Sequence, residues 1–280
     1  MKKVIIAVLL GVSLLFVNCS AKKELQTNSN TSGDKRSTQL DKTGGGEKSP
    51  KQNIHKSELD IKTSDGLNIS ANYFYQILDN NALQPVVVLI HQFNQNKEQW
   101  EQSFIDSLVD KGFKVMAYDI RGHGKSSQVS YKLDKLLTDP DEAPKDLIAV
   151  FEWLKKQPDV DTNRIGVMGT SIGGNLACYA RYNLVAKVVV SISNSKEGFY
   201  TFMKINELMM GRVFLRISNV LFICGKNDGT HEADEKDLYE NYLDDPKDMK
   251  VYDSDKHGIF LIKEHPEINT LAIDWFKKYL

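Results

Sequence analysis

The chain has 280 residues, 41% of them hydrophobic and 26% charged, which suffices for one large domain with a substantial core. Nine Lys and Arg against four Asp and Glu give residues 1–53 a charge of +5, which leaves −6 for residues 54–280 and a total of −1. Because the larger part is mildly acidic, nucleic acid is not expected as a partner.

The N-terminus has the pattern of a secretion signal. Two lysines precede an apolar run over 4–17 that is too short for a comfortable transmembrane helix. Cys19 follows, and the stretch resembles the lipobox of bacterial lipoproteins, although Phe16-Val17-Asn18 stands where small residues are usual. The resemblance implies removal of residues 1–18, lipidation of Cys19 and a lipid anchor in a membrane of the bacterial cell envelope. The alternative is an ordinary cleaved signal, or a retained anchor, in which Cys19 has no role.

The next segment is polar and rich in small residues. Residues 20–53 contain mainly Ser, Thr, Asn, Gln, Gly and Lys, so they bury too little apolar surface to offset the entropy of ordering. We therefore expect residues 19–53 to be a lipidated cysteine followed by a flexible tether, and residues 54–280 to be the folded domain. The remaining cysteines, Cys178 and Cys224, are expected in the core and not in a disulfide.

Predicted strands and helices alternate through residues 54–280. Two strands flank the turn at Asp65-Gly66. Further strands are predicted at 85–90, 113–120, 164–169, 187–193, 219–225 and 249–253. Helices are predicted at 98–111, 143–157, directly after Ser171, and at 234–243 and 267–279. This alternation indicates an α/β fold, with a mostly parallel twisted sheet, helices on both faces and the first two strands as an antiparallel edge.

The connection over 194–218 is the long one, and a small lid insertion is expected there. Its aromatic and methionine side chains over 198–215 either line an apolar pocket as a short cap or pack in the core.

The stretch MGTSIGGN at 168–175 places one serine between two glycines. Ser171 follows a predicted strand and precedes a predicted helix, which is the strand–turn–helix context of a nucleophile elbow. A Cβ at Gly169 or Gly173 would clash with neighbouring backbone, so the glycines have a steric reason to be there. Because a serine hydroxyl alone is a poor nucleophile, the pattern requires a base and an acid elsewhere.

Two later loops supply those residue types. Asp228 in GKNDGT follows the strand 219–225, and His257 in DSDKHGIF follows the strand 249–253, so both are expected at the same end of the sheet as Ser171. Asp253 and Asp255 are alternatives for the acid, although they lie in the loop of the base itself. The other histidines are expected to be structural (His91 and His123) or solvated (His55, His231 and His265).

The serine, acid and histidine come in the chain order Ser171, Asp228, His257, and the motif YDIRGHGKS stands at the end of the strand 113–120. In these two features residues 58–280 resemble the α/β-hydrolase superfamily. Within it they are most similar to the serine hydrolases grouped around dienelactone hydrolase and bacterial carboxylesterases. The resemblance implies a Ser-Asp-His triad and an oxyanion hole formed by the N–H groups of Ile172 and Phe93. Gln92 stands where the family usually has glycine.

The resemblance implies a serine hydrolase that cleaves small-molecule carboxylic esters or thioesters through an acyl-enzyme. We expect a monomer with no metal and no organic cofactor. The alternative is a catalytically silent surface lipoprotein of the same fold that binds a ligand or a host partner.

Overall fold

The computed structural model describes residues 53–78, 82–204 and 216–280. The predicted signal peptide, Cys19 and all but the last residue of the predicted tether lie outside these ranges, as does the 205–215 part of the predicted lid. Within the described ranges, no helix is both long enough and apolar enough to cross a membrane.

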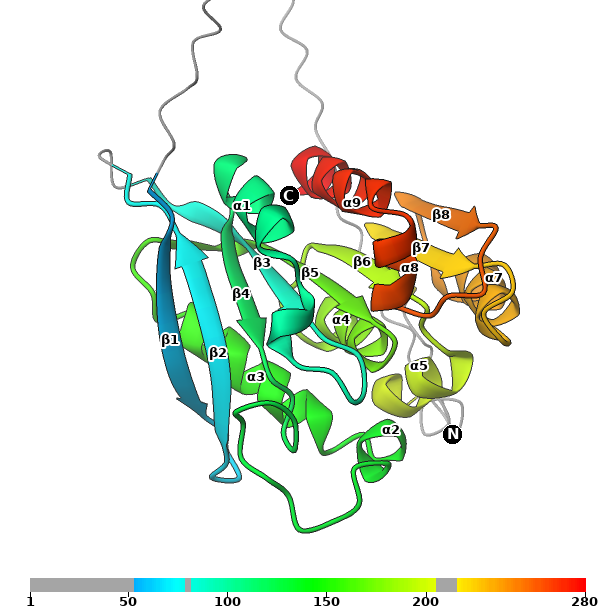
Figure 1. Ribbon diagram of the computed structural model, residues 1–280, viewed down its shortest axis with the longest axis horizontal. Helices are drawn as coiled ribbons and strands as arrows, with labels where there is room; N and C mark the ends of the chain where they lie inside the picture. The colour runs from blue at the N-terminus through cyan, green and yellow to red at the C-terminus, as the bar shows by residue number, and fades with distance from the viewer. Residues whose placement is uncertain (1–52, 79–81, 205–215) are drawn as a thin grey trace, which may run out of the picture. The chain divides into compact units, whose positions relative to one another are not determined.

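The sheet begins with the predicted hairpin. β1 (His55–Lys62) pairs antiparallel with β2 (Asn68–Tyr75) across a turn that contains Gly66. Gly66 has a φ of +89°, which glycine adopts without steric cost, and this explains the Asp-Gly sequence of the turn. β2 then pairs antiparallel with β4 (Lys114–Tyr118), so the hairpin forms the antiparallel edge of the sheet (Figure 1).

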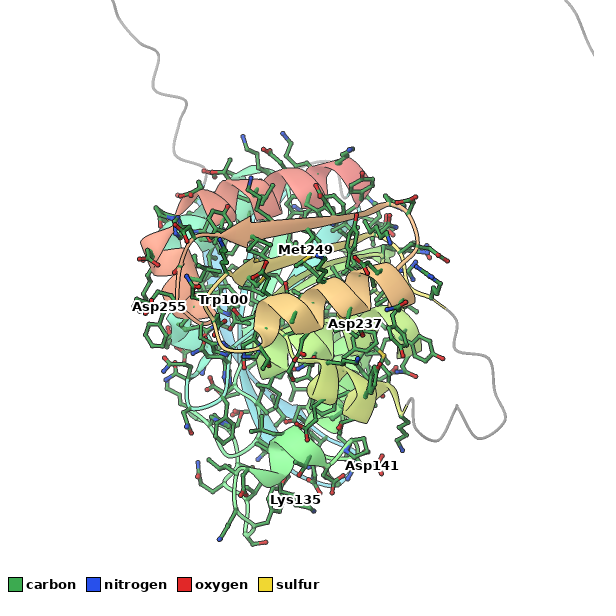
Figure 2. The ribbon with its side chains drawn as sticks, turned by 90° about the vertical axis from the view of Figure 1, so that its right-hand side faces the viewer. Trp100, Lys135, Asp141, Asp237, Met249 and Asp255 are labelled. Atoms are coloured by element: carbon green, nitrogen blue, oxygen red, sulfur yellow. The ribbon has the colours of Figure 1, made fainter. Side chains whose placement is uncertain are left out.

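The other strands form the parallel part of the sheet. The described strands lie in the order β1-β2-β4-β3-β5-β6-β7-β8, and each neighbouring pair from β4 to β8 is parallel. The strands not yet given are β3 (Gln84–Ile90), β5 (Val160–Thr170), β6 (Val188–Ile192), β7 (Val220–Gly225) and β8 (Lys247–Tyr252). Figure 2 shows the β8 edge, with Met249 on β8 and Asp237 on the neighbouring α7 (His231–Tyr242).

Helices cover both faces of the sheet, as predicted. On one face α1 (Gln102–Asp110), α8 (Ile259–Glu264) and α9 (Glu267–Tyr279) share an apolar cluster with the strands. On the other face the cluster includes α3 (Ala143–Leu154), α4 (Ile172–Asn183), α5 (Lys196–Met203) and α7. Successive β3 residues alternate between the two clusters, so the strand is buried on both sides, which accounts for its continuous apolar run.

Three short helices are missing from the sequence prediction: α2 (Lys135–Thr138), α5 and α8. With four to eight residues each, they are too short to show a helical period clearly. Several predicted boundaries are also wrong. The helix expected over 98–111 begins at Gln102 after a 3₁₀ turn, η1 (Lys97–Gln99), and the helix expected over 143–157 ends at Leu154.

Arg121 is a buried cation that joins separate parts of the fold. Its side chain is 1% exposed and lies 2.8 Å from carboxylate oxygens of Asp146 on α3, Asp65 in the hairpin turn and Glu142 ahead of α3. These contacts hold the pKa of the Asp65 carboxyl well below its usual range, chiefly through the hydrogen bond from Arg121. The guanidinium therefore holds the hairpin turn and α3 against the loop after β4.

We expect Arg121→Met to destabilise the fold strongly, because the substitution leaves buried Asp146 without its counter-ion. Breaking a buried pair in this way costs roughly 3–5 kcal/mol, measured as the free energy of unfolding in urea. Arg164→Met is the matched control, since Arg164 pairs with Asp161 while its side chain is 43% exposed. The control should lose no more than about 1 kcal/mol; equal losses would contradict the assigned role of Arg121.

Candidate active site

Ser171 lies on a sharp turn between β5 and α4. Its backbone has φ 54° and ψ −119°, a strained combination for a residue with a side chain. The turn is held by the Ser171 N–H, which donates to the carbonyl of Ile192 on β6 at 2.8 Å, and by the Gly174 and Asn175 N–H groups, which donate to the Ser171 carbonyl. The strand–turn–helix context predicted for Ser171 is confirmed.

The flanking glycines are required by close backbone contacts. A Cβ at Gly169 would lie 2.0 Å from the carbonyl oxygen of Gly173, and a Cβ at Gly173 would lie 2.3 Å from the carbonyl oxygen of Ile90. Any side chain at either position would push α4 away from β5 or β3. The G-x-S-x-G spacing is thus a steric requirement of this turn.

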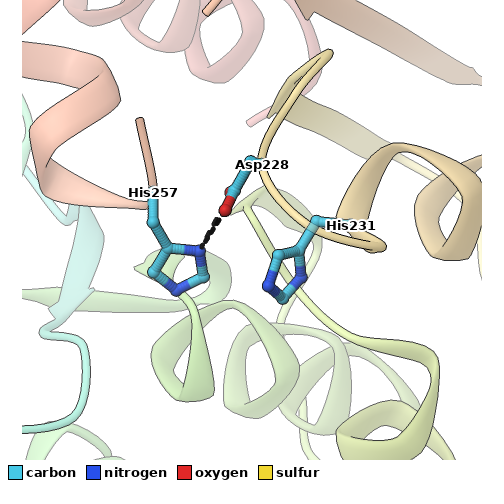
Figure 3. Close-up of side chains that lie close together, drawn as sticks. All are labelled: Asp228, His231 and His257. Carbon is cyan, nitrogen blue, oxygen red and sulfur yellow. Dashed lines mark hydrogen bonds and ion pairs between the residues drawn. The ribbon is translucent and has the colours of Figure 1, made fainter. Parts of the chain in front are cut away.

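Asp228 and His257 meet at the same end of the sheet. Asp228 lies in the loop after β7 and is buried, and its two carboxylate oxygens lie 2.9 and 3.1 Å from Nδ1 of His257 (Figure 3). The alternative acid Asp255 instead pairs with Lys256. Of the acids considered from the sequence, Asp228 is therefore the one that contacts the His257 ring.

The His257 loop lies beside the Ser171 turn. The N–H of Gly258 donates to the Ser193 hydroxyl at 3.0 Å, and Ser193 directly follows Ile192, the acceptor for the Ser171 N–H. A Cβ at Gly258 would lie 3.3 Å from Cβ of Thr170. Neighbouring positions on β5 and β6 therefore place the two loops next to each other.

The N–H groups of Phe93 and Ile172 are predicted from the sequence to form the oxyanion hole. Within residues 53–78, 82–204 and 216–280, neither group has a hydrogen-bond acceptor. The two loops also touch, because the position of a Gly173 Cβ lies 2.9 Å from the carbonyl oxygen of His91. Two backbone donors that lack an acceptor in the described part of the chain, on adjacent segments, form the kind of arrangement that binds an oxyanion.

His91 and His123 hold the peptide groups around Phe93. The Ile120 N–H donates to Nε2 of His91, so Nδ1 carries the proton and donates to the carbonyl of Gln92 at 2.7 Å. That carbonyl belongs to the same peptide group as the Phe93 N–H. In the same way, Nε2 of His123 accepts from the Asn94 N–H at 3.1 Å. The structural role predicted for both histidines is confirmed.

Gln92 connects three loops of the site. Its side-chain oxygen accepts the N–H of Ile259, at 2.8 Å, in the loop of His257. Its backbone N–H donates to the side chain of Gln99, which in turn donates to the Thr170 hydroxyl beside Ser171. The side chain that replaces the family's usual glycine therefore spans from the Phe93 loop to the His257 loop.

His231 is half-buried and contacts another side chain of the site, whereas the prediction placed it in solvent. It opens α7, and its ring lies 4.6 Å from the ring of His257, between centroids, at an angle of 45° (Figure 3). Its Nδ1 lies 3.1 Å from the carbonyl oxygen of Asn194. The prediction failed because residues 231 and 257 come from different loops, which the sequence cannot place side by side.

A pocket opens in front of Ser171. It has a volume of about 290 Å³ and is bounded by α2, the start of α4 and α5. Its lining is mixed, with apolar Leu137, Ile172 and Phe202 and polar Asn175 and Glu197 among the contributors. In α5, Phe199, Phe202 and Met203 are all buried in the core cluster, and Phe202 also lines this pocket. The described aromatic and methionine side chains of this segment therefore pack in or against the core, one of them also facing the pocket, while Met209 and Met210 lie outside the described ranges.

Comparison with known proteins identifies this architecture. Residues 85–189 match the family described as alpha/beta hydrolase fold, and residues 149–262 match the family described as BAAT / acyl-CoA thioester hydrolase C terminal. An esterase of Pyrococcus furiosus superposes with a TM-score of 0.62 at 22% identity, covering 81% of this chain and 93% of the esterase. The chain has the α/β-hydrolase fold.

The relatives of this α/β hydrolase fold include esterases. A dienelactone hydrolase of Anabaena variabilis superposes with a TM-score of 0.58 at 18% identity, covering 81% of this chain and 99% of that one. A bifunctional esterase/perhydrolase of Acinetobacter calcoaceticus is 33% identical over 134 residues, which is 46% of this chain and 42% of the relative. The chain spans about two fifths of the length of the curated relatives it matches, 40% and 37% for two uncharacterised Escherichia coli proteins.

His91 should make this α/β-hydrolase fold sensitive to acid. Burial lowers the pKa of His91 to about 4, below the roughly 6.5 of an unfolded histidine. Between these values the unfolded chain binds a proton that the folded chain does not, so stability is lost as the pH falls from 6.5 to 4. The loss through this one residue amounts to about 3 kcal/mol.

Urea unfolding at pH 7 and pH 4 measures this effect. We expect His91→Gln to be less stable at pH 7 but to lose about 3 kcal/mol less than the wild type on acidification. His55→Gln, on the exposed strand β1, should keep the wild-type pH dependence. An unchanged pH dependence in His91→Gln would show that His91 is not the group that titrates.

Proposed function

We propose that this chain is a serine hydrolase of carboxylic esters or thioesters that acts through an acyl-enzyme on Ser171. The strained Ser171 turn beside the Asp228–His257 pair carries the proposal. Strain of this kind exposes a hydroxyl above a helix N-terminus, and an Asp-oriented imidazole is the base that a serine requires. The esterase and thioester-hydrolase descriptions of the similar proteins support the same reaction class.

In the proposed mechanism, Ser171 attacks the substrate carbonyl and Nε2 of His257 takes the hydroxyl proton. Asp228 holds the proton on Nδ1, which leaves the lone pair on Nε2, and stabilises the imidazolium as it forms. The N–H groups of Phe93 and Ile172 bind the oxyanion. His257 then returns the proton to the leaving alcohol or thiol, and water hydrolyses the acyl-enzyme by the same steps.

The pocket at Ser171 favours a short or polar acyl group. A volume of about 290 Å³ lies at the lower end of the range for small-molecule sites. Its lining also includes Asn175, whose side-chain oxygen is buried without a hydrogen-bond partner among the described residues. Because a long alkyl chain would leave that oxygen unpaired, we propose short-chain substrates.

The alternative is a catalytically silent binding protein of the same fold. A binding protein has no need of an acceptor-free pair of N–H groups, a strained serine and an oriented imidazole at one end of the sheet. These features together favour the hydrolase.

Hydrolysis of p-nitrophenyl esters of increasing acyl length tests the proposed function. We expect activity on acetate and butyrate esters that falls with longer chains. Ser171→Ala should lower kcat by roughly 10⁴- to 10⁶-fold, because the nucleophile is lost. Ser107→Ala, an exposed serine on α1, is the matched control and should behave as the wild type.

A serine-reactive fluorophosphonate probe separates the hydrolase from the silent binding protein. The wild type should be labelled and Ser171→Ala should not. Folded wild-type protein that resists labelling, or equal labelling of the two, would rule out Ser171 as the nucleophile.

Gln92 should contribute to turnover although it does not touch the substrate. Gln92→Met keeps the side-chain volume but leaves the buried Ile259 N–H without its acceptor, which loosens the His257 loop. We expect kcat/KM to fall roughly 10-fold, since an unpaired buried donor costs about 1–3 kcal/mol. Gln102→Met, on the exposed start of α1, is the control. Wild-type turnover in Gln92→Met would contradict a positioning role.

A further inference from the structure

We propose that Asp228, His231 and His257 together bind one zinc-like transition-metal cation, and that the bound cation switches off the hydrolase. The binding site stands on geometry alone, whereas the inhibition rests on the function proposed above. The residues come from the loop after β7, the start of α7 and the loop after β8 (Figure 3).

The three side chains have the spacing of a metal site. One ligand atom from each lies within 4.8 Å of the other two. Metal–ligand distances of about 2.0–2.2 Å in a tetrahedral zinc site place neighbouring ligand atoms roughly 3.3–3.6 Å apart. The Asp228 oxygens are already 2.9 and 3.1 Å from Nδ1 of His257, and a ligand atom of His231 lies within 4.8 Å of both groups.

His231 is held in the form that a metal requires. A carbonyl oxygen accepts hydrogen bonds, so the contact with Asn194 means that Nδ1 of His231 carries the proton and Nε2 presents a lone pair. A backbone carbonyl on the second ring nitrogen is the usual support of a metal-bound histidine. Asn194 is held in turn, because its N–H donates to the buried Glu235 carboxyl at 3.1 Å. Burial raises the pKa of the Glu235 carboxyl well above its usual range.

The ligand types select the class of cation. Two imidazoles and one carboxylate suit Zn²⁺ and its neighbours, whereas Mg²⁺ and Ca²⁺ prefer oxygen ligands alone. Asp228 is buried, but both histidine rings are partly exposed, so a cation can reach the site from solvent. Three protein ligands leave the fourth tetrahedral position for water.

Binding would remove the proposed general base. A cation at Nδ1 of His257 uses the lone pair there, so the one ring proton moves to Nε2. Nε2 is the nitrogen that must accept the Ser171 proton. Asp228 becomes a metal ligand as well, so its carboxylate no longer accepts the hydrogen bond that orients the His257 ring. The cation and the active triad therefore exclude each other.

Calorimetric titration of the metal-free full chain with Zn²⁺ tests the site directly. We expect one equivalent of Zn²⁺ to bind to the wild type. His231→Gln should weaken binding by on the order of 100-fold or more, which exceeds the usual effect of replacing a residue that only supports a metal ligand. His55→Gln, an exposed histidine on β1, is the matched control and should bind as the wild type. Mg²⁺ should give no binding. His231→Asn serves as a second variant that lacks the ring.

The inhibition is tested by p-nitrophenyl acetate hydrolysis at increasing Zn²⁺, each variant being compared with its own metal-free rate. We expect wild-type inhibition that a chelator reverses, and a matching 100-fold shift in the inhibitory concentration for His231→Gln. Equal Zn²⁺ affinity in the wild type and both His231 variants, or no binding by the wild type, would overturn the metal site. His231-dependent binding by a chain that hydrolyses no ester would support the site and refute the proposed function instead.

Discussion

The close approach of α4 to the ends of β3 and β5 is the constraint on which the rest of the site depends. The α4 backbone comes so near that a Cβ at Gly169 or Gly173 would lie 2.0–2.3 Å from a carbonyl oxygen. At this turn Ser171 has a positive φ, and the Ile172 N–H, at the first position of α4, has no acceptor among the described residues. The close contact explains the glycines, and the strained serine and the N–H without an acceptor among the described residues lie at the same turn.

A network of buried hydrogen bonds connects the Ser171 turn to the loops after β3 and β8. Gln99 joins the Thr170 hydroxyl to the Gln92 N–H, and Gln92 reaches on to the Ile259 N–H. On the other side, buried Lys97 and Asp119 form an ion pair, and Asp119 also accepts the Lys125 N–H. Since each buried polar group here is costly to leave unpaired, the loops that carry the proposed nucleophile, base and oxyanion donors are held in one arrangement.

The histidines around this site differ through the partners of their ring nitrogens. Nε2 of His91 and of His123 accepts a backbone N–H, which keeps both rings neutral and structural. His257 instead has a carboxylate at Nδ1 and His231 has a carbonyl, so each can present a lone pair at Nε2. One residue type thus serves as a backbone support, as the proposed base and as the proposed metal ligand.

The sequence by itself determined the succession of strands and of the longer helices, the turn at Ser171 and the loops that carry Asp228 and His257. These features follow from local rules: apolar periodicity, steric limits at glycine and the common end at which parallel strands finish. Only the tertiary structure decided the contact of Gln92 with Ile259, 167 residues further along the chain, and the approach of His231 to His257. The chain between such residues leaves no periodic trace of their contact, because side-chain packing and loop conformation set the distance between them.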